Sequence, residues 1–188
     1  MATPQPLVWV FFYGTIMNPA VMKDYGATAN QVSPAKLAGF DIAIRPRPNL
    51  LRSERASVFG SLITVTHADL TTIYSGLEKN FGLKYLPEAV LASTLDGALR
   101  PALCYIAPSM ADAAPDPAFL RQLAQCVRTM GLPEWYAAHV ESLGLDSAQA
   151  GRRLRRSPAR DPASARMECR VSPQCAGRSK SLDNTASR

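Results

Sequence analysis

The sequence contains only two histidines, His67 and His139, and neither lies in a known catalytic or metal-binding pattern. The motifs H-E-x-x-H, paired C-x-x-C, P-loop and G-x-G-x-x-G are also absent. We interpret His67 as a residue in the first turn of a helix and His139 as part of an amphipathic helix. These absences argue against metal chemistry and against Ser/His hydrolysis.

Long apolar runs are missing as well. The N-terminal segment MATPQPLVWVFF lacks the positive residues that precede the apolar part of a secretory signal. Its apolar stretch is also far shorter than the roughly 20 residues that a membrane-spanning helix needs. We therefore expect a cytoplasmic protein without a membrane partner.

Excess positive charge is absent from most of the chain. The net charge is +6, but residues 151–188 hold ten Lys and Arg against three Asp and Glu, whereas residues 1–150 hold eleven against twelve. A nearly neutral body argues against a folded nucleic-acid-binding face. Binding of nucleic acid or an acidic surface through RRLRRSPAR is a weak alternative, because the tail has no aromatic residue.

The four cysteines do not form a common metal-binding spacing. Cys169 and Cys175 are separated by five residues, which matches no usual zinc pattern. Cys104 and Cys126 lie in apolar stretches, and we interpret them as buried, reduced thiols.

Local patterns in the first two thirds of the chain predict mostly strands. Residues 7–13 are continuously apolar, β-branched and aromatic, as in a fully buried strand. Asp96-Gly97 predicts a two-residue hairpin turn, and Gly60 predicts a bulge or a close backbone approach. We interpret PRPNLLRSER as a loop, because its prolines oppose regular pairing. The remaining expected strands cover 36–45, 57–66, 84–94 and 98–107.

Helix signals are clearest at three places. Thr66 and Asp69 have the spacing of a capping box, ahead of a helix with one apolar face. Asp116-Pro117 starts a second helix that ends at Gly131, and a third covers residues 133–143. Two helices that follow a run of strands predict an α+β domain.

The apolar pattern disappears after about residue 147. The last residues are rich in Arg, Ser, Pro and Ala and cannot bury enough apolar surface to fold. We therefore expect one domain over residues 1–146 and a basic, disordered tail over residues 147–188.

The end of the first strand carries the most informative motif, Tyr13-Gly14-Thr15-Ile16. A strand that ends in Tyr-Gly-Thr delivers successive N–H groups into a turn, and glycine lets the backbone approach a ligand closely. Such N–H groups bind carboxylates or oxyanions. An ordinary turn with Tyr13 packed beside it is the alternative.

The motif resembles the Tyr-Gly-Ser/Thr-Leu signature of the gamma-glutamylcyclotransferase-like family. Further similarities follow in order: LAGF at 37–40, V-x-G-x-L at 58–62, then Glu78 at a helix end and Tyr85 seven residues later. The resemblance covers about residues 7–107. It implies a small mixed, barrel-like β-sheet with flanking helices.

The catalytic helix departs from the family pattern, which ends in Leu-Asp-x-x-Glu-Gly with the Glu as acid/base. This chain has IYSGLEKNFG. One alignment places Glu78 at the catalytic position and keeps the spacing to Tyr85. The other matches Leu77-Glu78 to Leu-Asp and places Phe81 there, which leaves no catalytic carboxylate. We expect Glu78, with Glu88 or no carboxylate as alternatives.

The resemblance implies a gamma-glutamyl cyclotransferase, in which the substrate's α-amine attacks its own γ-carbonyl and releases 5-oxoproline and an amine or amino acid. Glu78 would transfer protons, residues 13–16 would hold a carboxylate or the γ-carbonyl oxygen, and Tyr85 would help to close the pocket. Neither metal nor cofactor is needed. The partner would be a small gamma-glutamyl compound, and the sequence leaves the oligomeric state open.

A catalytically silent family member is the second hypothesis. The same pocket would then bind a small carboxylated amine or a partner peptide. The arginines of the 46–55 region and its flank, Arg45, Arg47, Arg52 and Arg55, fit a solvated loop, or alternatively meet an anionic end of a substrate.

Overall fold

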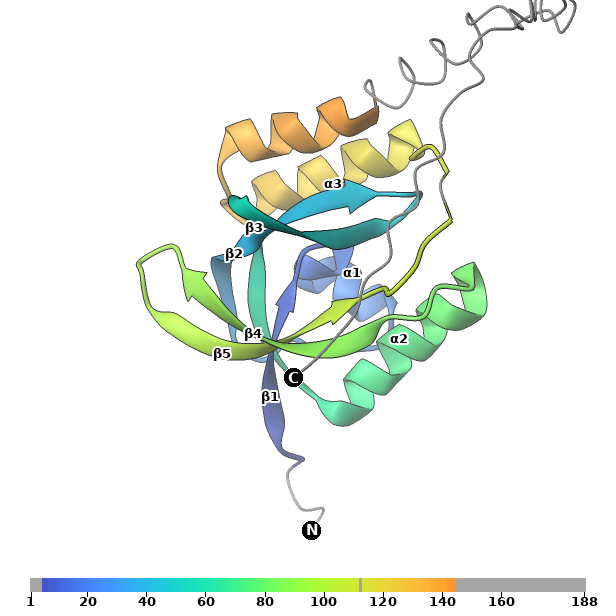
Figure 1. Cartoon of the computed structure of the whole chain (residues 1–188). Helices are drawn as coiled ribbons and strands as arrows, with labels where there is room; N and C mark the ends of the chain where they lie inside the picture. Colours follow the sequence, from blue (N-terminus) through green and yellow to red (C-terminus); the bar gives the residue numbers. More distant parts are fainter. Residues whose placement is uncertain (1–4, 112, 145–188) are drawn as a thin grey trace, which may run out of the picture. The chain divides into compact units, whose positions relative to one another are not determined.

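The apolar residues at the start of the chain form strand β1 (Leu7–Phe12), which lies between two partners. It pairs antiparallel with β3 (Pro48–Thr66) and parallel with β5 (Leu99–Ile106). In this computed structural model, which describes residues 5–111 and 113–144, the strands close into a barrel in the order β1-β3-β2-β4-β5 (Figure 1). The remaining two strands are β2 (Val32–Ile44) and β4 (Leu86–Thr94).

Helices lie outside the barrel. The turn η1 (Thr15–Met17) and the short helix α1 (Pro19–Asp24) follow β1, and α2 (His67–Phe81) connects β3 to β4. Helix α3 (Pro117–Thr129) and a helix over residues 134–144 lie side by side on a different side of the barrel from α2 (Figure 1). Of the helices described, none has both the length and the apolar character required to cross a membrane.

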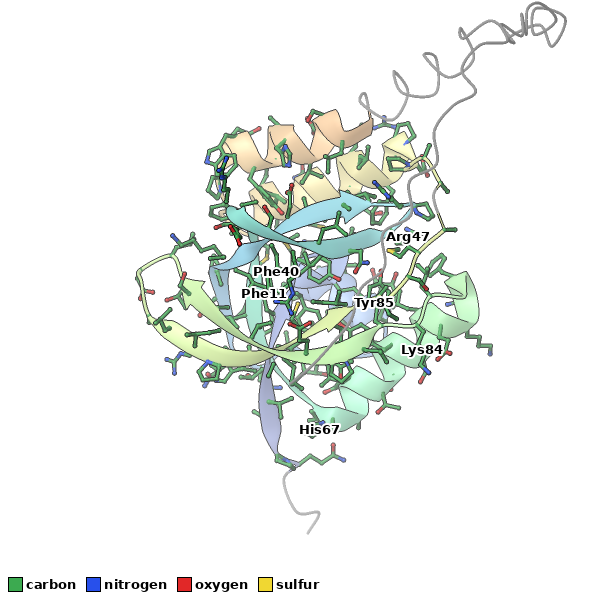
Figure 2. All side chains as sticks on the ribbon, viewed as in Figure 1. Phe11, Phe40, Arg47, His67, Lys84 and Tyr85 are labelled. Carbon is green, nitrogen blue, oxygen red and sulfur yellow. The ribbon has the colours of Figure 1, made fainter. Side chains whose placement is uncertain are left out.

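The core fills the barrel and the spaces beneath the helices. Figure 2 shows Phe11 and Phe40 inside, and both are almost completely buried. The predicted inner faces of α2 and α3 pack against this core, and Cys104 and Cys126 are buried free thiols, as expected. The α+β class with a barrel-like sheet and flanking helices is confirmed.

The interpretation of residues 46–55 as a loop is wrong, because most of them belong to β3. Strands β2 and β3 form a long hairpin in which Ile44 pairs with Pro48 and Phe40 pairs with Arg52. Pro48 is compatible with this pairing because it is the first residue of its strand, where proline is tolerated. A register shift between Ala38 and Phe40 lets the pairing continue along the hairpin.

Other local predictions agree with the structure. Strands β4 and β5 form the hairpin expected around Asp96-Gly97, and Gly97 has a positive φ of 95°. Thr66 and Asp69 form the capping box of α2, and Asp116 caps α3. His67 is the exposed first residue of α2.

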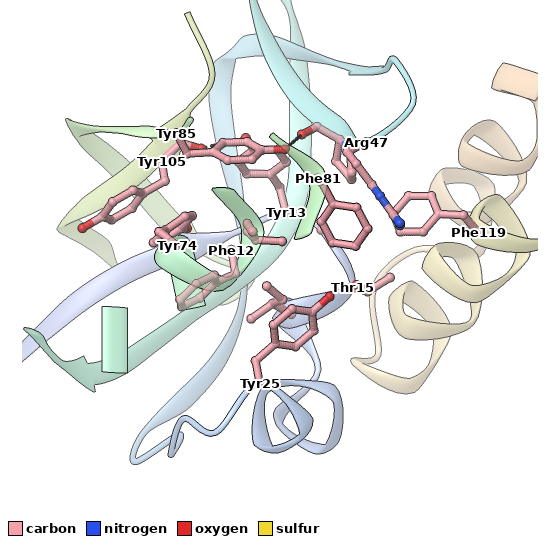
Figure 3. A pocket seen from close by; sticks show the side chains of 14 residues that line it. Phe12, Tyr13, Thr15, Tyr25, Arg47, Tyr74, Phe81, Tyr85, Tyr105 and Phe119 are labelled. Carbon is pink, nitrogen blue, oxygen red and sulfur yellow. Dashed lines mark hydrogen bonds between the residues drawn. The ribbon is translucent and has the colours of Figure 1, made fainter. Parts of the chain in front are cut away.

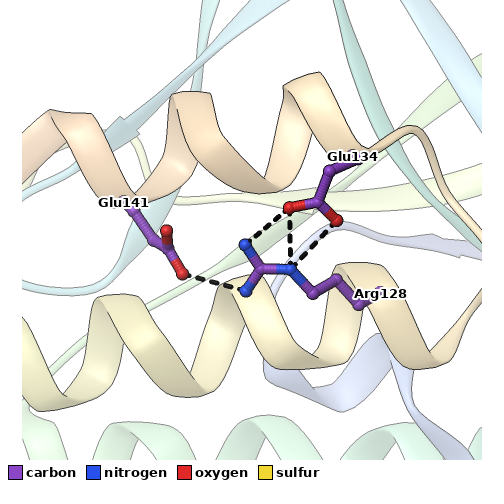
Figure 4. Close-up of polar contacts among 3 residues, drawn as sticks. All are labelled: Arg128, Glu134 and Glu141. Carbon is purple, nitrogen blue, oxygen red and sulfur yellow. Dashed lines mark hydrogen bonds and ion pairs between the residues drawn. The ribbon is translucent and has the colours of Figure 1, made fainter.

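Arg128 joins α3 to the helix of residues 134–144. Its guanidinium donates hydrogen bonds to both carboxylate oxygens of Glu134 and, over 2.9 Å, to Glu141 (Figure 4). The two predicted helices therefore pack as a pair. The predicted tail of residues 147–188 lies outside the described residues.

Candidate active site

The site begins where β1 ends. The chain leaves the barrel at Tyr13-Gly14 and turns at once into η1, where the N–H of Met17 donates to the carbonyl of Gly14 over 2.9 Å. The N–H groups of Thr15 and Ile16 lie within this turn, and none of the described hydrogen bonds uses them. A Cβ on Gly14 would lie 3.5 Å from the Pro48 ring, so the start of β3 packs against the turn.

A cavity of about 70 Å³ lies beside this turn. It has several times the space of roughly 10–15 Å³ that one water molecule requires. Figure 3 shows the aromatic side chains that surround it. The lining residues are Phe12, Tyr13, Gly14, Thr15, Ile16, Tyr25, Arg47, Pro48, Tyr74, Leu77, Phe81, Tyr85, Tyr105 and Phe119. The structure thus brings together five predicted site residues, Tyr13 to Ile16 and Tyr85.

Two tyrosine hydroxyls fix the wall of the cavity. Tyr13 donates to the backbone carbonyl of Tyr105 over 2.7 Å, and Tyr85 donates to the carbonyl of Pro48 over 2.8 Å. The ring of Tyr74 stacks on Tyr105 with centroids 3.7 Å apart. These contacts connect β1, the start of β3, α2 and β5 around one space.

The phenols of this wall are poor proton acceptors. Burial raises the pKa of Tyr13 and of Tyr74 well above the usual value. Burial also raises the pKa of Tyr85 to about 12, although nearby Arg47 works in the opposite direction. All three hydroxyls are therefore protonated and neutral at physiological pH.

Glu78 does not line this cavity. Its exposed side chain borders a second depression, together with His67, Ser75 and Lys84. Tyr74, Tyr85 and Tyr105 border both depressions and separate them. Glu88, the other candidate, forms an ion pair with Arg52 and lies against a different hollow.

Phe81 is the side chain that α2 presents to the cavity at its end. It is the last residue of the helix, and Gly82 caps the helix with a positive φ of 65°. In the alignment of Leu77-Glu78 with Leu-Asp, the pair Phe81-Gly82 takes the position of Glu-Gly in the family pattern. This geometry favours the alignment of Leu77-Glu78 with Leu-Asp.

Several residues of the site were not selected from the sequence. Tyr105, Phe119 and Tyr25 reach the cavity from β5, α3 and the end of α1, and no local motif marks them. Arg47 was grouped with three other arginines, but it is the one of the four whose side chain lines the cavity. Within residues 5–111 and 113–144, no group of three or more His, Cys, Asp or Glu is arranged to hold a metal.

The sequence matches the family model described as gamma-glutamyl cyclotransferase, AIG2-like, over residues 10–122. This segment is more than half of the chain, and it contains the strand-end turn, α2, the end of β1 and the other four strands of the barrel. The chain therefore belongs to this family. No curated protein gives a significant sequence match.

Solved structures share the fold at low sequence identity. A gamma-glutamyl cyclotransferase is 16% identical with a TM-score of 0.61, covering 73% of this chain and 88% of its own. An uncharacterized protein from Homo sapiens is 17% identical with a TM-score of 0.59, covering 72% and 87%. A yeast gamma-glutamyl cyclotransferase specific to glutathione is 11% identical with a TM-score of 0.51, covering 74% and 96%.

Proposed function

We propose that this chain binds a small gamma-glutamyl compound in the cavity beside Tyr13–Ile16 and retains little or no cyclotransferase activity. One observation carries the proposal. None of the 14 residues that line the cavity is an aspartate or glutamate, and the end of α2 contributes Phe81 to the lining and not Glu78.

The cavity has features suited to such a ligand. Aromatic rings form most of its wall, and polar groups converge at only a few points, which is typical of small-molecule sites. The turn at Thr15 and Ile16 offers backbone N–H groups that can donate hydrogen bonds to a carboxylate or to a carbonyl oxygen. Arg47 adds a positive charge on the same cavity.

The chemistry lacks a proton acceptor. In a cyclotransferase the α-ammonium must lose a proton before its nitrogen attacks the γ-carbonyl, and the leaving nitrogen must gain one. The neutral tyrosines cannot accept that first proton near neutral pH. A guanidinium has donors only and no acceptor. General acid–base catalysis contributes roughly 10²–10⁴-fold, so a site without it would be slower by about that factor.

An active cyclotransferase is the second candidate function, and the position of Glu78 near the cavity supports it. Glu78 is separated from the cavity by the side chains that both depressions share. A movement of Tyr74 or Tyr85 would connect the two spaces. Glu78 could then take the proton from the α-amine and give it to the departing nitrogen, while the new N–C bond closes 5-oxoproline and the old amide bond breaks.

One set of measurements separates the two candidates. The purified protein is incubated with gamma-glutamyl amino acids, glutathione and gamma-glutamylamines; binding is followed by calorimetry and 5-oxoproline by chromatography. We expect binding of at least one compound without 5-oxoproline formation. Formation of 5-oxoproline that is lost in Glu78→Gln would support turnover instead, and the absence of both binding and product would reject both candidates.

A further inference from the structure

Arg47 is a half-buried cation on an aromatic cavity. Its guanidinium carbon lies 4.1 Å from the ring centroid of Phe81 and 4.7 Å from that of Phe119. Figure 3 shows the guanidinium between these two rings. Cation–π contacts of this kind hold the group in place through its charge and require none of its N–H donors.

No carboxylate neutralises Arg47 in the described part of the chain. By contrast, Arg52 and Arg128 each form ion pairs with glutamates. None of the described hydrogen bonds uses the side-chain N–H groups of Arg47, and the cavity lining contributes no acidic residue. A partly desolvated cation without an anionic partner is unfavourable, so the site gains stability when an anion binds there.

Arg47 is also rigidly placed. Its neighbour Pro48 accepts the hydrogen bond of Tyr85, and the next residue, Asn49, exchanges two hydrogen bonds with the backbone of Ala107. Phe81 and Phe119 hold the other end of the side chain. Little conformational entropy is then lost when a ligand carboxylate meets the fork of N–H donors.

We propose that Arg47 determines specificity by binding a carboxylate on the amine-derived part of the ligand. This inference depends on the proposed binding of gamma-glutamyl compounds, because residues 13–16 would hold the gamma-glutamyl part of the same molecule. The cavity then selects gamma-glutamyl compounds whose amine portion is itself an acid, such as an amino acid, over those of simple amines.

The test uses two ligands that differ by a single carboxylate, γ-glutamylalanine and γ-glutamylethylamine. Dissociation constants are measured by calorimetry for the wild type, Arg47→Gln and Arg52→Gln. Arg52 is the matched control, because it also lies over an aromatic ring, that of Phe40, but outside the cavity. Thermal melting of each variant checks that it is folded.

We expect the wild type and Arg52→Gln to bind γ-glutamylalanine at least about tenfold more tightly than γ-glutamylethylamine. One charge-assisted hydrogen-bonded pair contributes enough free energy for this difference. In Arg47→Gln the ratio should fall close to one, through weaker binding of γ-glutamylalanine only. A wild-type ratio near one, or a ratio that Arg47→Gln leaves unchanged, would overturn the inference while leaving the proposed function intact.

If neither compound binds the wild type, the proposed function fails, and Arg47 is tested separately with 3-phenylpropionate and 3-phenylpropionamide. Binding of the acid alone, lost in Arg47→Gln, would support an anion site at Arg47 for another class of ligand. Failure of the acid to bind, or equal binding to wild type and variant, would overturn the inference.

Discussion

Gly60 lies so close to Phe12 that a Cβ added to it would be 2.1 Å from the Phe12 carbonyl oxygen. The added atom would also meet the ring of Phe11 at 3.1 Å. The two strands β1 and β3 can approach at this point only because residue 60 has no side chain. The close approach lies just before the Tyr13-Gly14 turn, and Phe12 itself lines the cavity.

Gly60→Ala should therefore destabilise the protein. We expect the free energy of unfolding to fall by about 3 kcal/mol, because the contact is with backbone and can be relieved only by moving a strand. Gly76→Ala is the matched control: nothing lies within 4 Å of that position in α2, so the change should raise stability by about 1 kcal/mol. Denaturant unfolding measures both, and effects of the same sign would contradict this account of Gly60.

Substitution of Asn49 should lower the free energy of unfolding as much as substitution of an apolar core residue. Its buried amide donates to the carbonyl of Ala107 over 2.9 Å and accepts from the N–H of Ala107 over 3.0 Å. Asn49→Leu would leave both backbone groups unpaired and should cost about 3 kcal/mol in unfolding free energy. Asn80→Leu, on the exposed surface of α2, should change it by less than about 0.5 kcal/mol. Equal effects in chemical denaturation would refute the structural role of Asn49.

Phe81→Glu should introduce 5-oxoproline formation. The new carboxylate would lie at the end of α2 beside Arg47, whose charge would keep it ionised, as a proton acceptor must be. Phe81→Gln has nearly the same size without the acid and is the control. Product formation is measured by chromatography with γ-glutamyl amino acids. Activity in both variants, or in neither, would argue against Phe81 as the substituted catalytic position.

Stability should decrease at alkaline pH. Burial raises the pKa of Tyr85 from 10.0 to about 12, and burial together with the charge of Glu88 raises that of Cys104 from 9.0 to about 12. Both pKa values are raised in the folded state, so their contribution is complete below the unfolded values and is lost as pH rises toward 12.

Urea unfolding at pH 8, 9.5 and 11 measures this loss. The free energy of unfolding should fall across the series, and it should fall less steeply in Tyr85→Phe and in Cys104→Ala, which each remove one titrating group. A wild-type stability that is constant or rises between pH 9.5 and 11 would contradict the prediction.

Local elements of the fold could be predicted from the sequence because they depend on neighbouring residues. The capping box of Thr66 and Asp69 and the turn at Asp96-Gly97 are each complete within four residues. The strand assignment failed at residues 48–55, where prolines suggested a loop. This segment is a strand because it pairs with β2, and a local sequence pattern contains no information about such pairing.

The sequence by itself determined the strand that ends in Tyr13-Gly14, the order of the elements and the α+β class. Only the tertiary structure decided which side chains share the cavity, because Tyr13 meets Tyr105 across 92 positions of sequence and Arg47 meets Phe119 from a different element. It also placed Phe81 at the cavity and Glu78 outside it. The physical reason is that local sequence patterns act between neighbouring residues, whereas closure of the barrel and packing of the helices against it select which side chains point into the cavity.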